Sequence, residues 1–248
     1  MPQCTVTKQD DLLTLSTGRI TRQFRWNGGN LISLSLAGHD PAHTWSLAGD
    51  KPDMDLLAAT VDASDGELVV RDAPAGIAPA HRRAEVTCRL GDLWVKRVFR
   101  LYDNCPAIGC DVYLRGRWQG DAGAQAGAVM ERIAARRAHL QLTCVQFFDR
   151  SDYHNNMVRT HSYLPYRFDD RLAGNLFLVH DTLCDDGLFL LKEAPCGDAQ
   201  LAWPGFDLVC KRGDLRLTGL GLTASDISDS EWTRGYGFVT GVAGADEF

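Results

Sequence analysis

The sequence has no apolar run close to the roughly 20 residues that cross a membrane as a helix. Its lysines and arginines form no block and the formal net charge is -6, which argues against nucleic-acid binding as the main task. The N-terminal residues have neither the basic nor the apolar segment of a signal peptide. These absences predict a cytoplasmic chain that binds neither membrane nor nucleic acid, unless a signal peptide has been removed.

Motifs of nucleotide, serine-hydrolase and zinc-peptidase chemistry are also missing. No two of the eight cysteines form a C-x-x-C pair, so we expect no metal and no cofactor. The even count permits four disulfides, but several cysteines sit in apolar alternation, as Cys88 and Cys110 do. We therefore interpret most of them as small buried side chains in a reducing compartment.

Helical signal is scarce, and the dominant pattern is an alternation of apolar and polar residues with a period of two. It is clear around residues 20–26, 86–90, 108–114 and 214–217, and turn residues such as Asn27-Gly28-Gly29-Asn30 separate the runs. The pattern predicts an all-β fold, a large antiparallel sandwich of two sheets, with at most one or two short helices. The one helix we expect spans residues 122–138, although two glycines weaken it. No linker divides the chain, so we expect a single domain over residues 1–248.

The densest polar cluster follows an apolar strand that ends at Phe147-Phe148. Its acids, amides and histidine suit the hydroxyls of a sugar, and its oxygens suit calcium, although the spacing of an EF-hand is absent. The alternative, given equal weight, is a loop whose Asp and Asn side chains cap their own backbone. The candidate ligand-binding residues in this loop are Asp149, Asp152, His154, Asn155 and Asn156.

Two further clusters carry candidate sugar ligands. Lys192 and Glu193 end an apolar strand before a proline, as a buried ion pair at a sheet edge or as a ligand clamp. Trp203 offers a ring on which a sugar can stack, and Asp207 lies close enough in sequence to accept from its hydroxyls. A single tryptophan is more often a core residue than a ligand platform.

The order of these segments resembles the N-terminal β domain of family 36 glycoside hydrolases and related α-galactosidases. The similarity covers about residues 90–240, with a looser match in WVKRVFRLY (94–102). The segments that carry it are FFDRSDYHNN (147–156), AGNLF (173–177), GLFLLKEAPC (187–196), Gln200-Leu201 and GFD (205–207). The resemblance implies a β supersandwich of the galactose mutarotase type that precedes a (β/α)₈ barrel. In such enzymes the barrel carries both catalytic aspartates, so none of the family's catalytic residues has a position in this chain.

The resemblance therefore predicts a non-catalytic domain that packs on the barrel of the same polypeptide and shapes the pocket for a galactoside-type carbohydrate. We expect this chain to be the N-terminal part of a longer glycosidase, with an apolar patch at the barrel contact and with homo-oligomers as a further possibility. Two alternatives stay open on the same fold. One is a carbohydrate-binding module that uses Trp203 and the 149–156 loop. The other is an aldose epimerase, which needs a general acid and base and for which His154 or His161 with Glu193 are the candidates.

Overall fold

The computed structural model describes residues 4–39, 42–47, 49–57, 62–118, 127–146, 158–195 and 205–244. Within these ranges the chain forms strands and one short 3₁₀ turn, Ala224–Asp226. The first strands are β1 (Thr5–Gln9), β2 (Leu12–Ser16), β3 (Ile20–Arg25), β4 (Ile32–His39), β5 (Ala42–Ser46), β6 (Ser64–Ala73), β7 (His81–Leu90), β8 (Leu93–Leu101) and β9 (Ala107–Gly116). The remaining strands are β10 (Val129–Ala134), β11 (Leu140–Val145), β12 (Val158–Tyr163), β13 (Asp170–Leu172), β14 (Leu176–Asp181), β15 (Asp186–Glu193), β16 (Leu208–Lys211), β17 (Asp214–Thr218), β18 (Thr233–Arg234) and β19 (Gly237–Gly244).

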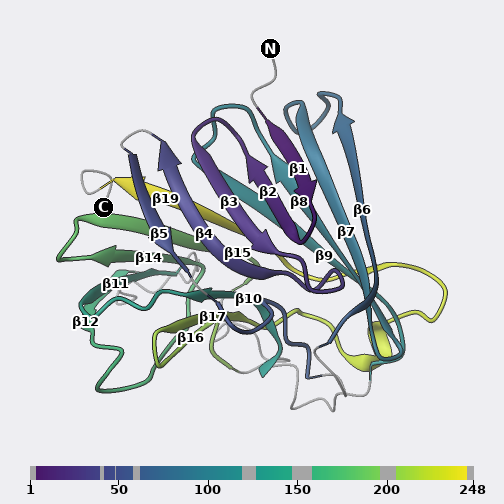
Figure 1. Ribbon diagram of the computed structural model, residues 1–248. Helices are drawn as coiled ribbons and strands as arrows, with labels where there is room; N and C mark the ends of the chain where they lie inside the picture. The colour runs from purple at the N-terminus through teal and green to yellow at the C-terminus, as the bar shows by residue number, and fades with distance from the viewer. Residues whose placement is uncertain are drawn as a thin grey trace.

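The largest sheet runs in the order β12-β11-β14-β15-β19-β9-β8-β7-β6, with β18 paired to β9. All of its neighbouring strands are antiparallel. Two smaller sheets, β1-β2-β3-β4-β5 and β10-β17-β16-β13, form the rest of the molecule. Figure 1 shows the five-stranded sheet in front of the middle of the large sheet, with β7 and β6 to its right and β14, β11 and β12 to its lower left. The all-β antiparallel sandwich expected from the alternation is confirmed.

Both smaller sheets pack on the same face of the large sheet, which we call the inner face. Phe24 of β3 lies 5.7 Å from Phe99 of β8, measured between ring centroids. Glu131 of β10 contacts Arg97 of β8, and an isolated bridge joins Asp55 to β10. The two small sheets therefore adjoin and together form the second layer of the sandwich (Figure 1).

The alternating pattern of the sequence sets which side chains reach this core. On β9, Ile108, Cys110, Val112 and Leu114 are buried together. The hairpin expected around residues 27–30 is confirmed, since β3 and β4 pair in antiparallel register on either side of it. Of the described cysteines, those at positions 4, 88, 110, 144 and 210 are buried and free, as expected of small apolar side chains.

The expected helix over residues 122–138 is wrong where the structure describes it. Residues 129–134 form strand β10, which pairs with β17, and all six of its side chains are buried. A strand covered on both faces has no polar face, so its sequence shows no alternation with a period of two. Helix propensity alone favoured the alanines here, and sheet pairing overrode it.

A cluster of fully buried charges sits where the three sheets meet. Arg22 of β3 and Arg97 of β8 each contact one carboxylate oxygen of Glu131, the second at 2.6 Å. Arg22 also lies 3.8 Å from Asp53, which accepts hydrogen bonds from the Ser33 amide and hydroxyl at 2.9 and 2.7 Å. Burial first, then the charge of Glu131, raises the pKa of Asp53 to about 7. This cluster ties the layers together, because its members come from all three sheets.

Candidate functional site

A polar hollow opens where β15 ends beside β18 and β19. It has a volume of about 270 Å³, and its lining residues are Glu193, Gly221, Arg234, Gly235, Tyr236 and Gly237. A carboxylate, a guanidinium and a phenol therefore face one small space bounded by glycine backbone. Convergent polar groups of this kind orient a bound ligand.

The hollow exists because glycines occupy its walls. A Cβ on Gly237 would lie 2.5 Å from Oε2 of Glu193 and 3.2 Å from Oδ1 of Asp111. A Cβ on Gly221, whose φ is +70°, would meet the ring of Tyr236. Side chains at either position would push the polar groups out of place, so the two glycines keep this space open.

A chain of alternating charges runs from the hollow across the outer face of the large sheet, the face opposite the core. Arg100 of β8 donates to Glu193 at 2.6 Å and lies 3.5 Å from Asp111. Asp111 of β9 accepts from Arg234 at 2.8 Å. Burial lowers the pKa of Arg100, but Asp111 and Glu193 outweigh it, so the net shift is upward. The hydrogen bond that Arg234 donates to Asp111 likewise raises the pKa of Arg234.

Beneath the hollow, Lys192 and Asp207 neutralise each other inside the core. Lys192 Nζ lies 2.6 Å from Asp207 Oδ1, and both residues are almost fully buried. Asp207 Oδ2 also accepts the backbone amide of Gly174 at 2.9 Å. Lys192 stands 5.8 Å from the ring centroid of Tyr236, so the ion pair supports that wall from behind.

The structure therefore separates the residues that the sequence grouped together. Lys192 and Glu193 are strand neighbours and point to opposite faces, so Lys192 pairs with Asp207, while Glu193 enters the hollow. The predicted pair of Lys192 with Glu193 is therefore wrong: Lys192 forms a buried ion pair with Asp207, and Glu193 pairs with Arg100. The other predicted residues, Asp149, Asp152, His154, Asn155, Asn156 and Trp203, lie outside the described residues.

Of the two histidines proposed to act with Glu193 in an epimerase, His161 does not lie near it, and His154 is outside the described residues. His161 pairs across the sheet with Leu142, on the inner face, and contacts Asp170 directly. Glu193 is on the outer face, three strands away. General acid–base catalysis requires the acid and the base to contact the same sugar, and His161 and Glu193 are on opposite faces of the sheet, so they cannot do so.

Sequence reasoning missed Arg100, Asp111, Arg234 and Tyr236. The first two sit in strands whose polar faces looked like ordinary solvated surface. The glycine pattern around Tyr236, Gly235-Tyr236-Gly237, was the only local signal, because paired glycines allow close approach of the backbone. The convergence itself depends on sheet pairing between residues more than 100 positions apart, such as Arg234 and Tyr113.

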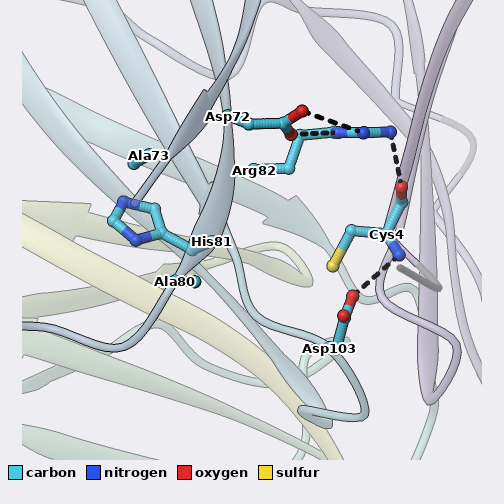
Figure 2. A pocket seen from close by; sticks show the side chains of 7 residues that line it. All are labelled: Cys4, Asp72, Ala73, Ala80, His81, Arg82 and Asp103. Atoms are coloured by element: carbon cyan, nitrogen blue, oxygen red, sulfur yellow. Dashed lines mark hydrogen bonds and ion pairs between the residues drawn. The ribbon is translucent and has the colours of Figure 1, made fainter. Parts of the chain in front are cut away.

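A second hollow, of about 170 Å³, lies beside the N-terminal segment (Figure 2). Arg82 is paired with Asp72 at 2.9 Å and donates to the carbonyl of Cys4 at 2.8 Å, while the Cys4 amide donates to Asp103. Burial, together with the hydrogen bond to Asp103, raises the pKa of the Cys4 thiol to about 12. The Cys4 thiol therefore stays protonated, and the hydrogen bonds around it tie the N-terminal segment to β7 and to the turn after β8.

In fold, the chain is similar to part of several family 36 α-galactosidases. It matches AgaB from Geobacillus stearothermophilus with a TM-score of 0.63 and 8% identity, over 97% of this chain and 41% of that one. It matches the galactosidase domain of the α-galactosidase-sucrose kinase AgaSK with a TM-score of 0.64 and 9% identity, over 97% and 42%. AgaA from Geobacillus stearothermophilus gives a TM-score of 0.57 at 8% identity, over 94% and 40%.

The chain thus spans about two fifths of the length of these enzymes. No protein-family model and no curated protein sequence matches it. At this level of identity the similarity establishes the fold. In the ranges that the structure describes, no helix is long and apolar enough to cross a membrane.

Proposed function

We propose that this chain is a non-catalytic accessory domain of an α-galactosidase-like glycoside hydrolase. It packs on a catalytic barrel of the same polypeptide and shapes one wall of the pocket for a galactoside-type sugar. The observation that carries the proposal is the coverage of the fold match, which takes in 97% of this chain but only 41% of AgaB. An accessory domain predicts that asymmetry, since most of the relative then lies outside the match.

The charge pattern of the hollow supports a wall rather than a catalytic centre. Arg100 and Arg234 stay protonated at any working pH, and each holds a carboxylate by hydrogen bonds. Carboxylates held in this way accept hydrogen bonds from sugar hydroxyls. Proton transfer would need a group that titrates near neutral pH, which an arginine does not do.

Exposed aromatic side chains support a contact with a further domain. Tyr166, Phe168 and Phe206 are 65%, 44% and 43% exposed and lie around β13, at the edge of the four-stranded sheet. Exposed aromatic groups of this kind are enriched at protein interfaces. We assign the barrel contact to this edge, and we keep a homo-oligomer as part of the same proposal.

Two measurements test the accessory role. The coding sequence downstream of the Phe248 codon is expected to continue into a barrel-sized series of β and α units, and a stop codon there would overturn the proposal. The purified chain is expected to release no phenol from aryl α-galactosides. Turnover that co-purifies with the chain and survives a second, unrelated purification would also overturn it.

A carbohydrate-binding module is the second candidate, and the hollow at Glu193 is the observation that favours it. It predicts that galactose binds the chain alone and that Glu193→Gln and Tyr236→Ala each weaken this binding. Glu231→Gln, an exposed acid in the loop before β18, is the matched control. Titration calorimetry with galactose decides between the two functions, because the accessory role predicts no measurable affinity without the barrel.

A further inference from the structure

A row of cations crosses the outer face of the large sheet beside the hollow, over β6 to β9. We define the cationic strip as Arg71, Arg83, Lys96 and Arg115 with the rings of Trp94, Tyr113 and Trp232. The sheet register places these residues on one face. Arg71 is opposite Arg83, Lys96 is opposite Tyr113, and Arg115 is opposite Trp94.

Aromatic rings, rather than carboxylates, hold the two central cations. Lys96 Nζ lies 4.5 Å from the ring centroid of Trp232 and 5.0 Å from that of Tyr113. The Arg115 guanidinium lies 4.7 Å from Trp232 and 5.8 Å from Trp94. Within the described part of the chain neither cation forms an ion pair with a carboxylate, so both keep their charge available to an anion.

Like charges stand directly opposite one another on the neighbouring strands. Arg71, Arg83 and Arg100 occupy one row across β6, β7 and β8. Cross-strand pairs of like charge are unfavourable unless something offsets them. Glu193 neutralises Arg100 at 2.6 Å and Glu85 lies 3.6 Å from Arg83, whereas Arg71 is exposed.

Lys96 lies among charges of both signs. Burial lowers the pKa of Lys96 most, the charge of Glu85 raises it, and the individually smaller effects of Arg83, Arg115 and Arg71 lower it. A bound anion would offset part of the repulsion from the three arginines. The face is locally positive in a chain whose net charge is -6, so the charge is concentrated rather than average.

We propose that the cationic strip binds an acidic saccharide, a chain of sugars that carry carboxylates. The carboxylates pair with Lys96 and Arg115, and the sugar rings lie along the edges of Trp94 and Trp232. Hydroxyls donate to the acids of the same face, Glu85 and Asp111. The strip continues into the hollow, because Arg234 pairs with Tyr113, which faces Lys96.

The acids on this face select a saccharide over a nucleic acid. A phosphate backbone has no donors for Glu85 and Asp111 and would be repelled by them, whereas sugar hydroxyls donate to carboxylates. This site does not depend on the proposed accessory role, since it requires no barrel.

The test uses oligogalacturonate and its methyl ester, which keeps the backbone and removes the charge. Calorimetry at low salt is expected to show binding of the acid, with the ester at least about tenfold weaker and with affinity falling as salt rises. Lys96→Gln is expected to lose about tenfold in affinity, and Lys96→Arg is expected to restore most of it. Lys8→Gln is the matched control, because Lys8 makes a similar contact with Trp26 at 4.9 Å on the five-stranded sheet.

Three results would overturn the proposal. They are absence of binding to the acid, an equal effect of Lys8→Gln, and equal or tighter binding of single-stranded DNA of matched charge. If Lys96→Gln does not fold by circular dichroism, Arg115→Gln replaces it with the same expectation. The pKa of Lys96, followed by NMR of labelled lysine, is expected to rise when the acid binds, and an unchanged value would place the ligand elsewhere.

Discussion

Glu131→Gln is expected to destabilise the protein strongly without changing the shape of its core. Glu131 is fully buried, and its two oxygens contact Arg22 and Arg97, which are also buried. The amide leaves one buried positive charge uncompensated and turns an NH₂ group toward a guanidinium. The structural cause of the loss is therefore electrostatic, since glutamine fills the same volume.

The magnitude follows from the burial of the partners. Removing one member of a buried ion pair costs about 3–5 kcal/mol, a large part of the roughly 5–15 kcal/mol that stabilises a typical domain. Asp53 offsets part of this loss, because its carboxylate, 3.8 Å from Arg22, is no longer repelled by the charge of Glu131. We therefore expect a loss near the lower limit, about 3 kcal/mol.

Urea unfolding at pH 8, followed by tryptophan fluorescence and circular dichroism, measures this change. The midpoint is expected to fall by about 1–2 M with an unchanged slope. Glu85→Gln is the control, because the Arg83–Glu85 pair at 3.6 Å is partly exposed and is worth about 0–1 kcal/mol. A double variant, Arg97→Met with Glu131→Leu, is expected to be more stable than Glu131→Gln, since no charge is stranded. A loss below about 1 kcal/mol in Glu131→Gln, or a double variant that is weaker still, would refute the reasoning.

Three further predictions concern pH, the hollow and the cysteines. The raised pKa of Asp53, about 7 against an ordinary 3.8, means that the folded state binds a proton that the unfolded state has released, so stability falls as pH rises from about 4 to 7. The free energy of unfolding, measured by urea titration at several pH values, is expected to fall by at most about 4 kcal/mol over this range. In Asp53→Asn this dependence on pH is expected to disappear, and a dependence that persists would show that other groups cause it. Gly237→Ala is expected to displace Glu193 from Arg100 and to reduce any sugar affinity of the hollow, with less than about 1 kcal/mol lost in stability; an unchanged crystallographic position of Glu193 would contradict this. Of the described cysteines, Cys184 is exposed and is expected to react with a thiol reagent first, whereas buried ones, including Cys88 with its pKa raised to about 12 by burial, react only on unfolding; mass spectrometry of the labelled peptides shows the order.

The all-β class and the core were readable from the sequence because they depend on local pattern. A strand with one buried face must alternate, and β7 and β8 do so for most of their length. The same pattern placed Arg22 on the apolar side of its strand, between Ile20 and Phe24, and the structure buries it there. Periodicity thus reported the direction of a side chain even when its chemistry seemed unsuitable for a core.

The one expected helix failed for the complementary reason. β10 is covered on both faces, so its alternation disappears and its sequence no longer distinguishes strand from helix. Pairing with β17, nearly 90 residues later, decides its conformation. A contact at that separation leaves no trace in a local window.

The candidate site shows the same division. Its residue types were partly recognised, since Glu193, Lys192 and Asp207 were singled out. Their partners were not, because Arg100 meets Glu193 across 93 positions of sequence. The residue type fixes the sign of a charge. Whether that charge is neutralised, buried without a partner or available to a ligand depends on the residues that sheet pairing places next to it.

The sequence by itself determined the all-β class, the faces of the alternating strands and the burial of most described cysteines, because each follows from the chemistry of neighbouring residues. Only the tertiary structure decided that Lys192 forms a buried ion pair with Asp207 while Glu193 lines the surface hollow. It also decided that Lys96 and Arg115 both contact the ring of Trp232. Those outcomes arise from the order and register of the strands in the sheets. That order is set by the burial of the whole apolar surface at once rather than by any segment alone.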